Sequence, residues 1–195
     1  MKKSIISFAI ILFIGMGMAQ AQETNFGIKA GFNSYNITND PGDNFDARSG
    51  FNAGIFSHIH LSPQFALQPE LLYSQQGTTN IDFGAVAADL KLDYLNLPVM
   101  LQYMFDNGFR LEAGPQLGFL LSAKMESGDA EEDVKDELKS VDFGIGAGLG
   151  YIHVPSGFGV NARYNLGLTD LNETEGVTTK NRGFQVGIFY QFSHK

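Results

Sequence analysis

The chain has 195 residues, 44% of them hydrophobic and 17% charged, a composition that excludes a disordered or fibrous protein and fits one sizeable domain. Its formal net charge of −8 argues against a nucleic-acid partner, because a phosphate backbone attracts basic proteins. Cysteine is absent, which excludes disulfides, zinc–thiolate sites and cysteine nucleophiles.

The first residues have the order of a cleavable secretory signal. Met1-Lys2-Lys3 is followed by an apolar run from Ile5 to Met18 and then by Ala19-Gln20-Ala21. We therefore predict a signal peptide over residues 1–21 and a mature domain over residues 22–195. Loss of the two lysines would take the formal charge from −8 to −10. No run of about 18 apolar residues follows the signal, so a membrane-spanning helix is not expected.

Eight segments of the mature chain alternate apolar residues with glycine or polar residues, the pattern of a strand with two unlike faces. Near the end of the chain, for example, Val160 and Tyr164 alternate with Asn161 and Arg163. In chain order the segments are 26–33, 51–61, 65–76, 90–105, 109–122, 141–151, 158–169 and 183–192. An even number of strands is what a closed antiparallel barrel requires.

The fourth segment contains a break in its alternation. Leu95 and Leu97 begin a row on one face, but Leu90 and Leu92 are out of phase with that row. We predict a β-bulge near Asp93–Tyr94, because one extra residue would restore the phase.

The connections between the segments alternate strictly in length. Two of the short connections end in glycine, which supplies the positive φ of a tight turn. The short connections are Ser62-Pro63-Gln64, Asp106-Asn107-Gly108 and Pro155-Ser156-Gly157, and the long ones are 37–47, 78–88, 125–138 and 170–181. Outer-membrane barrels have short periplasmic turns and long outer loops, so this order predicts four outer loops.

The alternation alone leaves open which face meets the surroundings, because a soluble barrel turns its apolar face inward and a membrane barrel turns it outward. The polar faces are rich in glycine, which weakens a strand but suits a narrow barrel interior. The apolar faces hold more Phe, Tyr and Leu than such an interior could pack, so we predict that they contact lipid. The alternative is a soluble periplasmic carrier, similar to a lipocalin, with a small apolar ligand inside.

With this orientation the charges that point inward are balanced in sign. They are Lys29, Arg110 and Arg163 with Glu70, Glu112 and Asp142, and the bulge would add Lys91 and Asp93. We interpret this set as a charge network that fills the barrel interior, because buried charges persist when they are paired and hydrogen-bonded. The alternative is an ion or proton path, although wide aqueous channels need about sixteen strands.

Two other features could be binding sites. His58 and His60 share a face and could bind a metal with Glu70, but no complete ligand set is recognisable and we expect no metal. The second feature is an acidic segment over residues 126–137. It could bind cations or a basic partner, or it could be a solvated outer loop, and its acidic residues do not have the spacing of a calcium-binding loop. Its acidic residues are Glu126, Asp129, Glu131, Glu132, Asp133, Asp136 and Glu137.

No motif for catalysis is present: there is no nucleophile elbow, phosphate-binding loop or paired-carboxylate cleft. We therefore expect neither an enzyme nor a cofactor.

Four stretches carry a resemblance to a known family: Phe65–Gln75 (FALQPELLYSQ), Leu92–Pro98 (LDYLNLP), Leu111–Gly118 (LEAGPQLG) and Ala162–Leu168 (ARYNLGL). Through them the chain resembles the PorT-like outer-membrane β-barrel proteins, small barrels of Gram-negative bacteria related in architecture to OmpA and OmpX. The resemblance implies an eight-stranded outer-membrane barrel without a cofactor. One namesake member is implicated in type IX secretion and gliding, although no motif here points to that branch.

The sequence therefore predicts an all-β protein, an eight-stranded antiparallel up-and-down transmembrane β-barrel that follows a cleaved signal peptide and lies in the cell outer membrane. We expect outer-membrane lipid and a protein bound at the outer loops as partners, with a structural, adhesion or secretion-associated role. We expect no nucleic acid, and we expect the protein to act as a monomer.

Overall fold

The computed structural model describes residues 24–40, 43–82, 87–128, 130–172 and 178–192. The predicted signal peptide lies outside these residues, as does Asp129 of the acidic segment. Within the described ranges, no helix is long and apolar enough to cross a membrane.

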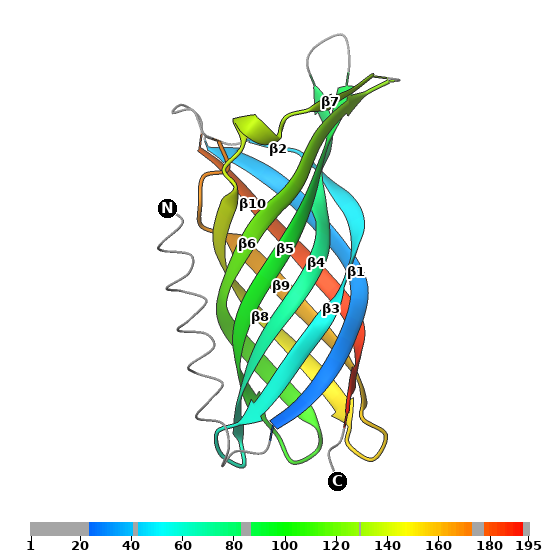
Figure 1. Ribbon diagram of the computed structural model, residues 1–195, viewed down its shortest axis with the longest axis vertical. Coiled ribbons are helices and arrows are strands. Elements are labelled where there is room, and N and C mark those ends of the chain that lie inside the picture. Colours follow the sequence, from blue (N-terminus) through cyan, green and yellow to red (C-terminus); the bar gives the residue numbers. More distant parts are fainter. Residues whose placement is uncertain (1–23, 41–42, 83–86, 129, 173–177, 193–195) are drawn as a thin grey trace.

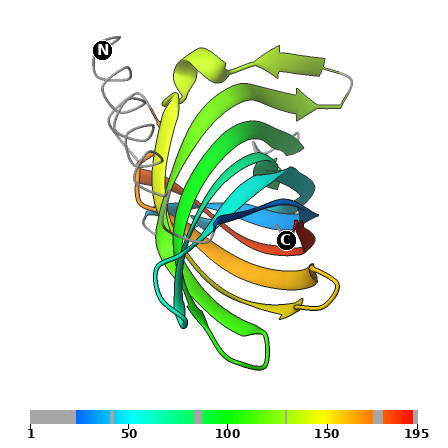
Figure 2. The ribbon, with the colours of Figure 1, turned by 60° about the horizontal axis from the view of Figure 1, so that its bottom comes forward.

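Eight long strands form one closed antiparallel sheet (Figure 1), and Figure 2 shows them curving around a common axis. They are β1 (Thr24–Asp40), β3 (Asp46–His60), β4 (Phe65–Asp82), β5 (Ala87–Met104), β6 (Phe109–Ser127), β8 (Val141–His153), β9 (Phe158–Gly167) and β10 (Thr178–Gln191). Each pairs with the next along the chain, and β10 closes the sheet on β1, from Gly27↔Gln191 to Asp40↔Thr178. The predicted eight-stranded up-and-down barrel is confirmed.

The short and long connections lie at opposite ends of the barrel (Figure 1). In two of the short turns, Gly108 and Gly157 have φ angles of 89° and 76°, the left-handed region that glycine enters without strain. Three short elements lie in the long connections: β2 (Asp43–Asn44), β7 (Ala130–Asp133) and the 3₁₀ turn η2 (Lys135–Glu137). Following the rule for outer-membrane barrels, we call the end with short turns the inner end and the other the outer end.

Strand extensions occupy much of the predicted outer loops 78–88 and 125–138. β4 continues to Asp82, β5 begins at Ala87, and β6 continues to Ser127 before the chain turns back as β7. These extensions pair with one another, so their backbone groups are hydrogen-bonded without help from the rest of the barrel. One side of the wall therefore rises above the rest of the outer rim (Figure 1).

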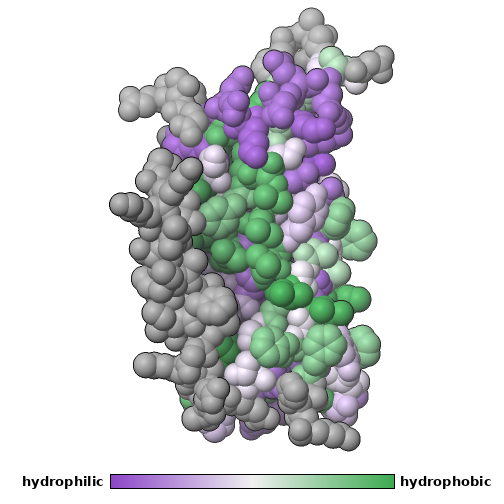
Figure 3. Space-filling model, viewed as in Figure 1, coloured by the Kyte–Doolittle hydropathy of each residue, from purple (hydrophilic) through white to green (hydrophobic). Residues whose placement is uncertain are grey.

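The bulky apolar side chains point away from the lumen. Tyr164 and Ile188 are 43% and 62% exposed, whereas Arg163, next to Tyr164, and Gln185, opposite Arg163 in β10, are 0% and 3% exposed. Figure 3 shows apolar side chains over the middle of the visible face and hydrophilic ones gathered at the outer end. A belt of this size is far larger than the apolar patches of soluble monomers. The lipocalin-like alternative is therefore wrong, and the belt faces lipid.

The break in the fourth segment has a different cause from the one predicted. The even-numbered residues of β5 are buried without interruption from Leu90 to Gln102, so Leu90 and Leu92 point inward and Lys91 and Asp93 point outward. A register shift does occur at Asp93–Tyr94, but the extra residue is Leu121 on β6. The upper lumen accepts leucine because outer connections cover it, as described below.

Glycines make room for three of the aromatic rings inside the barrel. Tyr35, Phe56 and Phe189 point inward, and each lies opposite a glycine in the neighbouring strand: Gly183, Gly27 and Gly159, respectively. A Cβ atom at any of these glycines would overlap the facing ring. An aromatic ring that covers a cross-strand glycine shields its backbone and helps to fix the register.

Three prolines lie at one level of three adjacent strands: Pro69 on β4, Pro98 on β5 and Pro115 on β6. Proline cannot donate to a ladder and is uncommon in the middle of a sheet. The register is nevertheless the same on both sides, as Pro69↔Val99 and Leu72↔Asn96 show. The outer surface has a shallow hollow of about 350 Å³ here, lined by the prolines together with Leu97, Val99, Leu117 and Phe143.

We predict that Gly183→Ala destabilises the barrel by about 1–3 kcal/mol, because the added methyl group overpacks the Tyr35 ring. Gly150→Ala is the matched control: it is also an inward glycine, but the nearest atom to its added Cβ is the Val160 carbonyl oxygen, at 3.1 Å. Urea unfolding in detergent micelles, followed by circular dichroism, measures both. Equal stabilities of the two variants would contradict the proposed ring packing.

Candidate functional site

The centre of the barrel interior holds a cluster of four charged side chains. Arg163 on β9 donates from Nη1 and Nη2 to the two carboxylate oxygens of Glu70 on β4, at 3.0 and 2.8 Å. Its Nε donates to Glu112 Oε1 on β6 at 2.7 Å, and Lys29 Nζ on β1 donates to Glu70 at 3.2 Å. Two cations thus meet two carboxylates, and all four side chains are at most 5% exposed.

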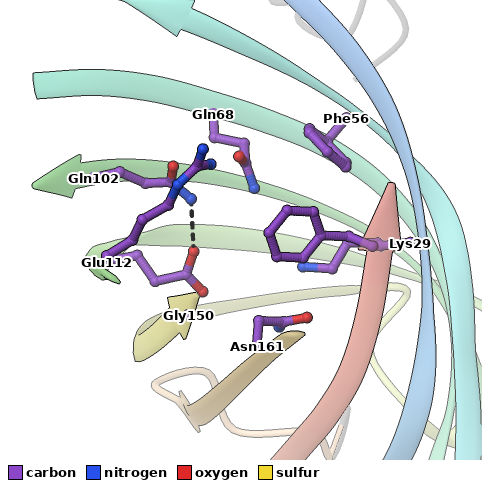
Figure 4. Close-up of a pocket in the computed structure, with 9 residues that line it drawn as sticks. Lys29, Phe56, Gln68, Gln102, Glu112, Gly150 and Asn161 are labelled. Carbon is purple, nitrogen blue, oxygen red and sulfur yellow. Dashed lines mark hydrogen bonds between the residues drawn. The ribbon is translucent and has the colours of Figure 1, made fainter. Parts of the chain in front are cut away.

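Glutamines satisfy the remaining carboxylate positions. Gln68 Nε2 donates to Glu70 Oε1 at 2.8 Å, and Gln102 Nε2 donates to Glu112 Oε2 at 2.9 Å, the bond drawn in Figure 4. Buried ion pairs are tolerated when further hydrogen bonds complete them, and this cluster meets that condition. We refer to Lys29, Glu70, Glu112 and Arg163 as the central cluster.

A layer of uncharged polar side chains lies on the outer side of the central cluster. Asn33 Nδ2 donates to Ser74 Oγ at 2.9 Å, and Asn33 Oδ1 accepts from Asn52 Nδ2 at 2.5 Å. The Tyr35 hydroxyl accepts from Asn165 Nδ2 and Gln185 Nε2, at 2.8 and 3.2 Å. This layer consists of Asn33, Tyr35, Asn52, Ser74, Gln76, Asn165, Asn181 and Gln185.

Arg110 and Asp142 point inward but are not ion-paired with the central cluster. Arg110 lies near the inner end, donates from Nη2 to Gln191 Oε1 at 3.3 Å, and lies over the Phe189 ring with Cζ 5.9 Å from the ring centroid. Asp142 lies near the outer end of β8, opposite Gly118, and lines a water-sized cavity of about 10 Å³ with Asn165.

The two histidines considered for metal binding are close to each other at the inner end. Their rings are edge to face with centroids 4.7 Å apart, and His58 Nδ1 is 3.3 Å from Gln68 Oε1. In the part of the chain that the structure describes, no group of three or more His, Asp and Glu side chains is placed to hold a metal ion. Glu70 is instead bound by Arg163 and Lys29.

An apolar cluster closes the outer mouth of the barrel. Leu90 and Leu92 from β5 meet Val134 and Leu171, which come from the connections that follow β7 and β9. We call this cluster the outer plug, and its buried members are Ile37, Leu90, Leu92, Tyr94, Leu120, Ala123, Val134 and Leu171. This cluster was not predicted from the sequence, in which the only signal for it is the pair Leu90 and Leu92, out of phase with the rest of their segment.

Backbone bonds hold these two connections over the mouth. Lys139 N donates to Leu171 O and Leu171 N donates to Thr179 O, both at 2.8 Å. Asp170 Oδ1 accepts from the backbone N–H groups of Thr179 and Asn172, at 3.0 and 3.2 Å. These two bonds lower the pKa of the Asp170 carboxyl, and the bond from Thr179 has the larger effect. The predicted loops 125–138 and 170–181 are therefore partly folded onto the barrel.

The acidic segment forms a β-hairpin that continues from the wall. Within it Lys124 Nζ contacts Glu131 Oε1 at 2.6 Å, which raises the pKa of Lys124, and Lys91 on β5 pairs with Glu126. Asp133 Oδ1 accepts from the Lys135 backbone N–H at 3.0 Å.

The other described acidic residues of the segment face solvent. Glu132, Asp136 and Glu137 are exposed, and no ion pair joins them to a cation of the described chain. We call residues 122–137 the acidic hairpin.

We predict that Arg163→Gln destabilises the barrel by about 3–5 kcal/mol, because it leaves two buried carboxylates without their shared cation. Glu112→Gln should cost less in the Arg163→Gln background than in the natural protein, with a coupling of roughly 0.5–3 kcal/mol. Circular dichroism during urea unfolding measures this double-mutant cycle. The exposed pair Lys124→Gln and Glu131→Gln is the control, with a coupling of about 0–1 kcal/mol. Additive effects at the buried pair would contradict the described contacts.

Solved structures of two bacterial proteins share this fold. Ail, the attachment invasion locus protein of Yersinia pestis, is 18% identical, with a TM-score of 0.56 over 87% of this chain and 99% of its own. Neisserial surface protein A is 15% identical, with a TM-score of 0.59 over 87% and 99% of the two chains. At these identities the likeness shows the fold alone. No curated protein matches the sequence.

A family model supplies the membership that the structures do not. The model described as an outer membrane protein beta-barrel domain matches residues 18–173, which include most of the barrel. The lipid-facing belt and the closed eight-stranded sheet agree with it. The chain therefore belongs to the outer-membrane protein β-barrel domain family and is an integral protein of the cell outer membrane.

Proposed function

We propose that this barrel is a non-enzymatic binding protein whose acidic hairpin engages a basic protein segment outside the cell. The observation that carries the proposal is the ridge at the outer rim, where β4, β5, β6 and β7 extend beyond the other strands. Acidic side chains outnumber lysines along the acidic hairpin, and three of the acids are exposed without an ion-paired cation in the described chain. A rigid, charged ridge attracts a partner of opposite charge and orients it.

The ligand proposed here is opposite in charge to a ligand of one structural neighbour. Ail has been solved in complex with the heparin analogue sucrose octasulfate, a polyanion. A polyanion would be repelled by Glu132, Asp136 and Glu137, so the partner proposed here is cationic. An adhesion role is compatible with this surface, provided that the bound surface is basic.

The barrel interior is proposed to be a structural filling rather than a path for ions. The central cluster crosses the lumen from β1 to β4, β6 and β9, and the cavities beside it are about 10 Å³ each, room for a single water molecule. The outer plug closes the mouth above it.

We predict that the purified protein forms no stable ion-conducting channel in a planar lipid bilayer. Arg163→Lys should behave in the same way, because it preserves a cation in the central cluster. Discrete conductance steps from the natural protein would overturn the assignment of the interior as a filling.

We also propose a branch of the family for this protein and a monomeric state. The four stretches quoted above support membership of the PorT-like branch, and a secretion-associated role follows only if that branch is the right one. A monomer is supported by closure of β10 on β1, which leaves no unpaired strand edge in the barrel wall. Partners that co-purify with the natural protein, and are lost when residues 125–138 are deleted, would identify the pathway.

We predict that the triple variant Glu132→Gln, Asp136→Asn and Glu137→Gln binds a lysine decapeptide roughly threefold or more weakly than the natural protein, since each exposed charge contributes about 0.2–1 kcal/mol. Biolayer interferometry on protein in nanodiscs of zwitterionic lipid, at low and moderate salt, measures the affinity. Binding should weaken as salt increases.

Two single variants serve as controls. Asp106→Asn removes an acidic residue from the inner end and should leave peptide binding unchanged, whereas Lys135→Gln removes a cation from the acidic hairpin and should strengthen it. Tighter binding of sucrose octasulfate than of the lysine peptide, or unchanged binding by the triple variant, would refute the proposed partner.

A further inference from the structure

The inner end of the lumen contains a buried cation that the central cluster does not neutralise. Arg110 is only 8% exposed, and its one hydrogen bond to a side chain of the described residues goes to the neutral amide of Gln191. In the same part of the chain no carboxylate lies within ion-pair distance of the guanidinium. Arg163, by contrast, binds two carboxylates. Removal of a charge from water without an opposite charge nearby is costly, so the position needs an explanation.

The nearest candidate partner inside the protein is already engaged. Glu112 is two residues from Arg110 on the same strand and the same face, but its two oxygens accept from Arg163 Nε and Gln102 Nε2, at 2.7 and 2.9 Å. Figure 4 shows Glu112 turned toward Gln102. Among the described strand residues that point inward, from the central cluster to the inner turns, there is therefore one more cation than carboxylate, since Lys29 and Arg163 match Glu70 and Glu112.

Arg110 lines an open cavity of about 340 Å³ at the inner end. Residues of all three short turns line it, including Pro63, Asp106 and Gly157, so the cavity opens on the periplasmic side. Its polar lining comes from Asn25, His60, Asp106, Arg110 and Gln191. The volume is about ten times that of one water molecule in the liquid, enough for a small solute with part of its hydration shell.

We propose that this cavity, the inner vestibule, binds a small soluble oxyanion, a carboxylate or a phosphate, through the Arg110 guanidinium. A guanidinium presents a planar set of N–H donors that matches two oxygens of such an anion. The stacking of Arg110 on Phe189 and its bond to Gln191 hold the group in place before the ligand arrives. Asp106 lies on the same cavity and disfavours ligands of high negative charge, so a monoanion is bound better than a polyanion.

The test uses the full barrel in maltoside micelles, whose headgroups carry no phosphate, so that binding of a soluble anion is measured alone. Titration with acetate and with inorganic phosphate at low ionic strength, followed by the ¹⁵N–¹H resonance of the Arg110 Nε group, should give a saturable shift. Arg110→Gln should weaken anion binding about tenfold or more, as for loss of a charged hydrogen bond, when binding is followed by the amide resonances of the inner turns. Asp106→Asn should strengthen it, because a repulsive charge is removed.

The controls separate binding from folding. Lys135→Gln removes a cation at the outer end and should leave the titration unchanged, and heat-modifiable migration on a denaturing gel reports whether each variant has folded. If Arg110→Gln does not fold, two other variants still test the proposal. Arg110→Lys is expected to weaken anion binding, and Asp106→Asn is expected to strengthen it. No saturable shift in the natural protein, or an unchanged titration in a folded Arg110→Gln variant, would overturn the proposal.

Discussion

Closure of β10 on β1 is the constraint on which the rest of the molecule depends, because it encloses a lumen too narrow for bulk water. In the middle of the barrel, the polar side chains that point inward are therefore bonded mainly to other side chains. Tyr35, Phe56 and Phe189 are accommodated by glycines in the facing strands. Arg163 is accommodated by Glu70 and Glu112 from two strands on other parts of the wall. The same closure leaves the outside of the barrel free to be almost entirely apolar.

The charges inside the barrel have an order along its axis. The central cluster is neutral as a unit, Arg110 lies between it and the inner turns, and Asp142 lies toward the outer end. The two ends of the lumen also differ in polarity. The inner end opens into a polar vestibule, while the outer end is closed by the apolar outer plug. Because of this asymmetry, the two proposed sites, one for soluble anions and one for basic partners, lie on opposite sides of the membrane.

Alternation and connection lengths were sufficient to predict the eight strands and the outward direction of Tyr164 and Ile188, since a two-residue period is a local property of the chain. The inward direction of Lys29, Glu70, Glu112 and Arg163 followed in the same way. Which of these charges would meet could not be predicted, because Glu70 and Arg163 are 93 residues apart and their contact depends on barrel register. Leu90 and Leu92 were misinterpreted for a related reason: whether a leucine is tolerated inside depends on Val134 and Leu171, which distant connections supply.

The three prolines at one level of β4, β5 and β6 have a consequence for the unfolded chain, before the barrel forms. An outer-membrane protein crosses the periplasm unfolded, and its apolar alternating segments can then pair with other copies into aggregates. Proline interrupts the continuous amide ladder on which such stacks depend. β4, β5 and β6 are the three longest strands of the sheet, and each contains one proline that interrupts such a ladder.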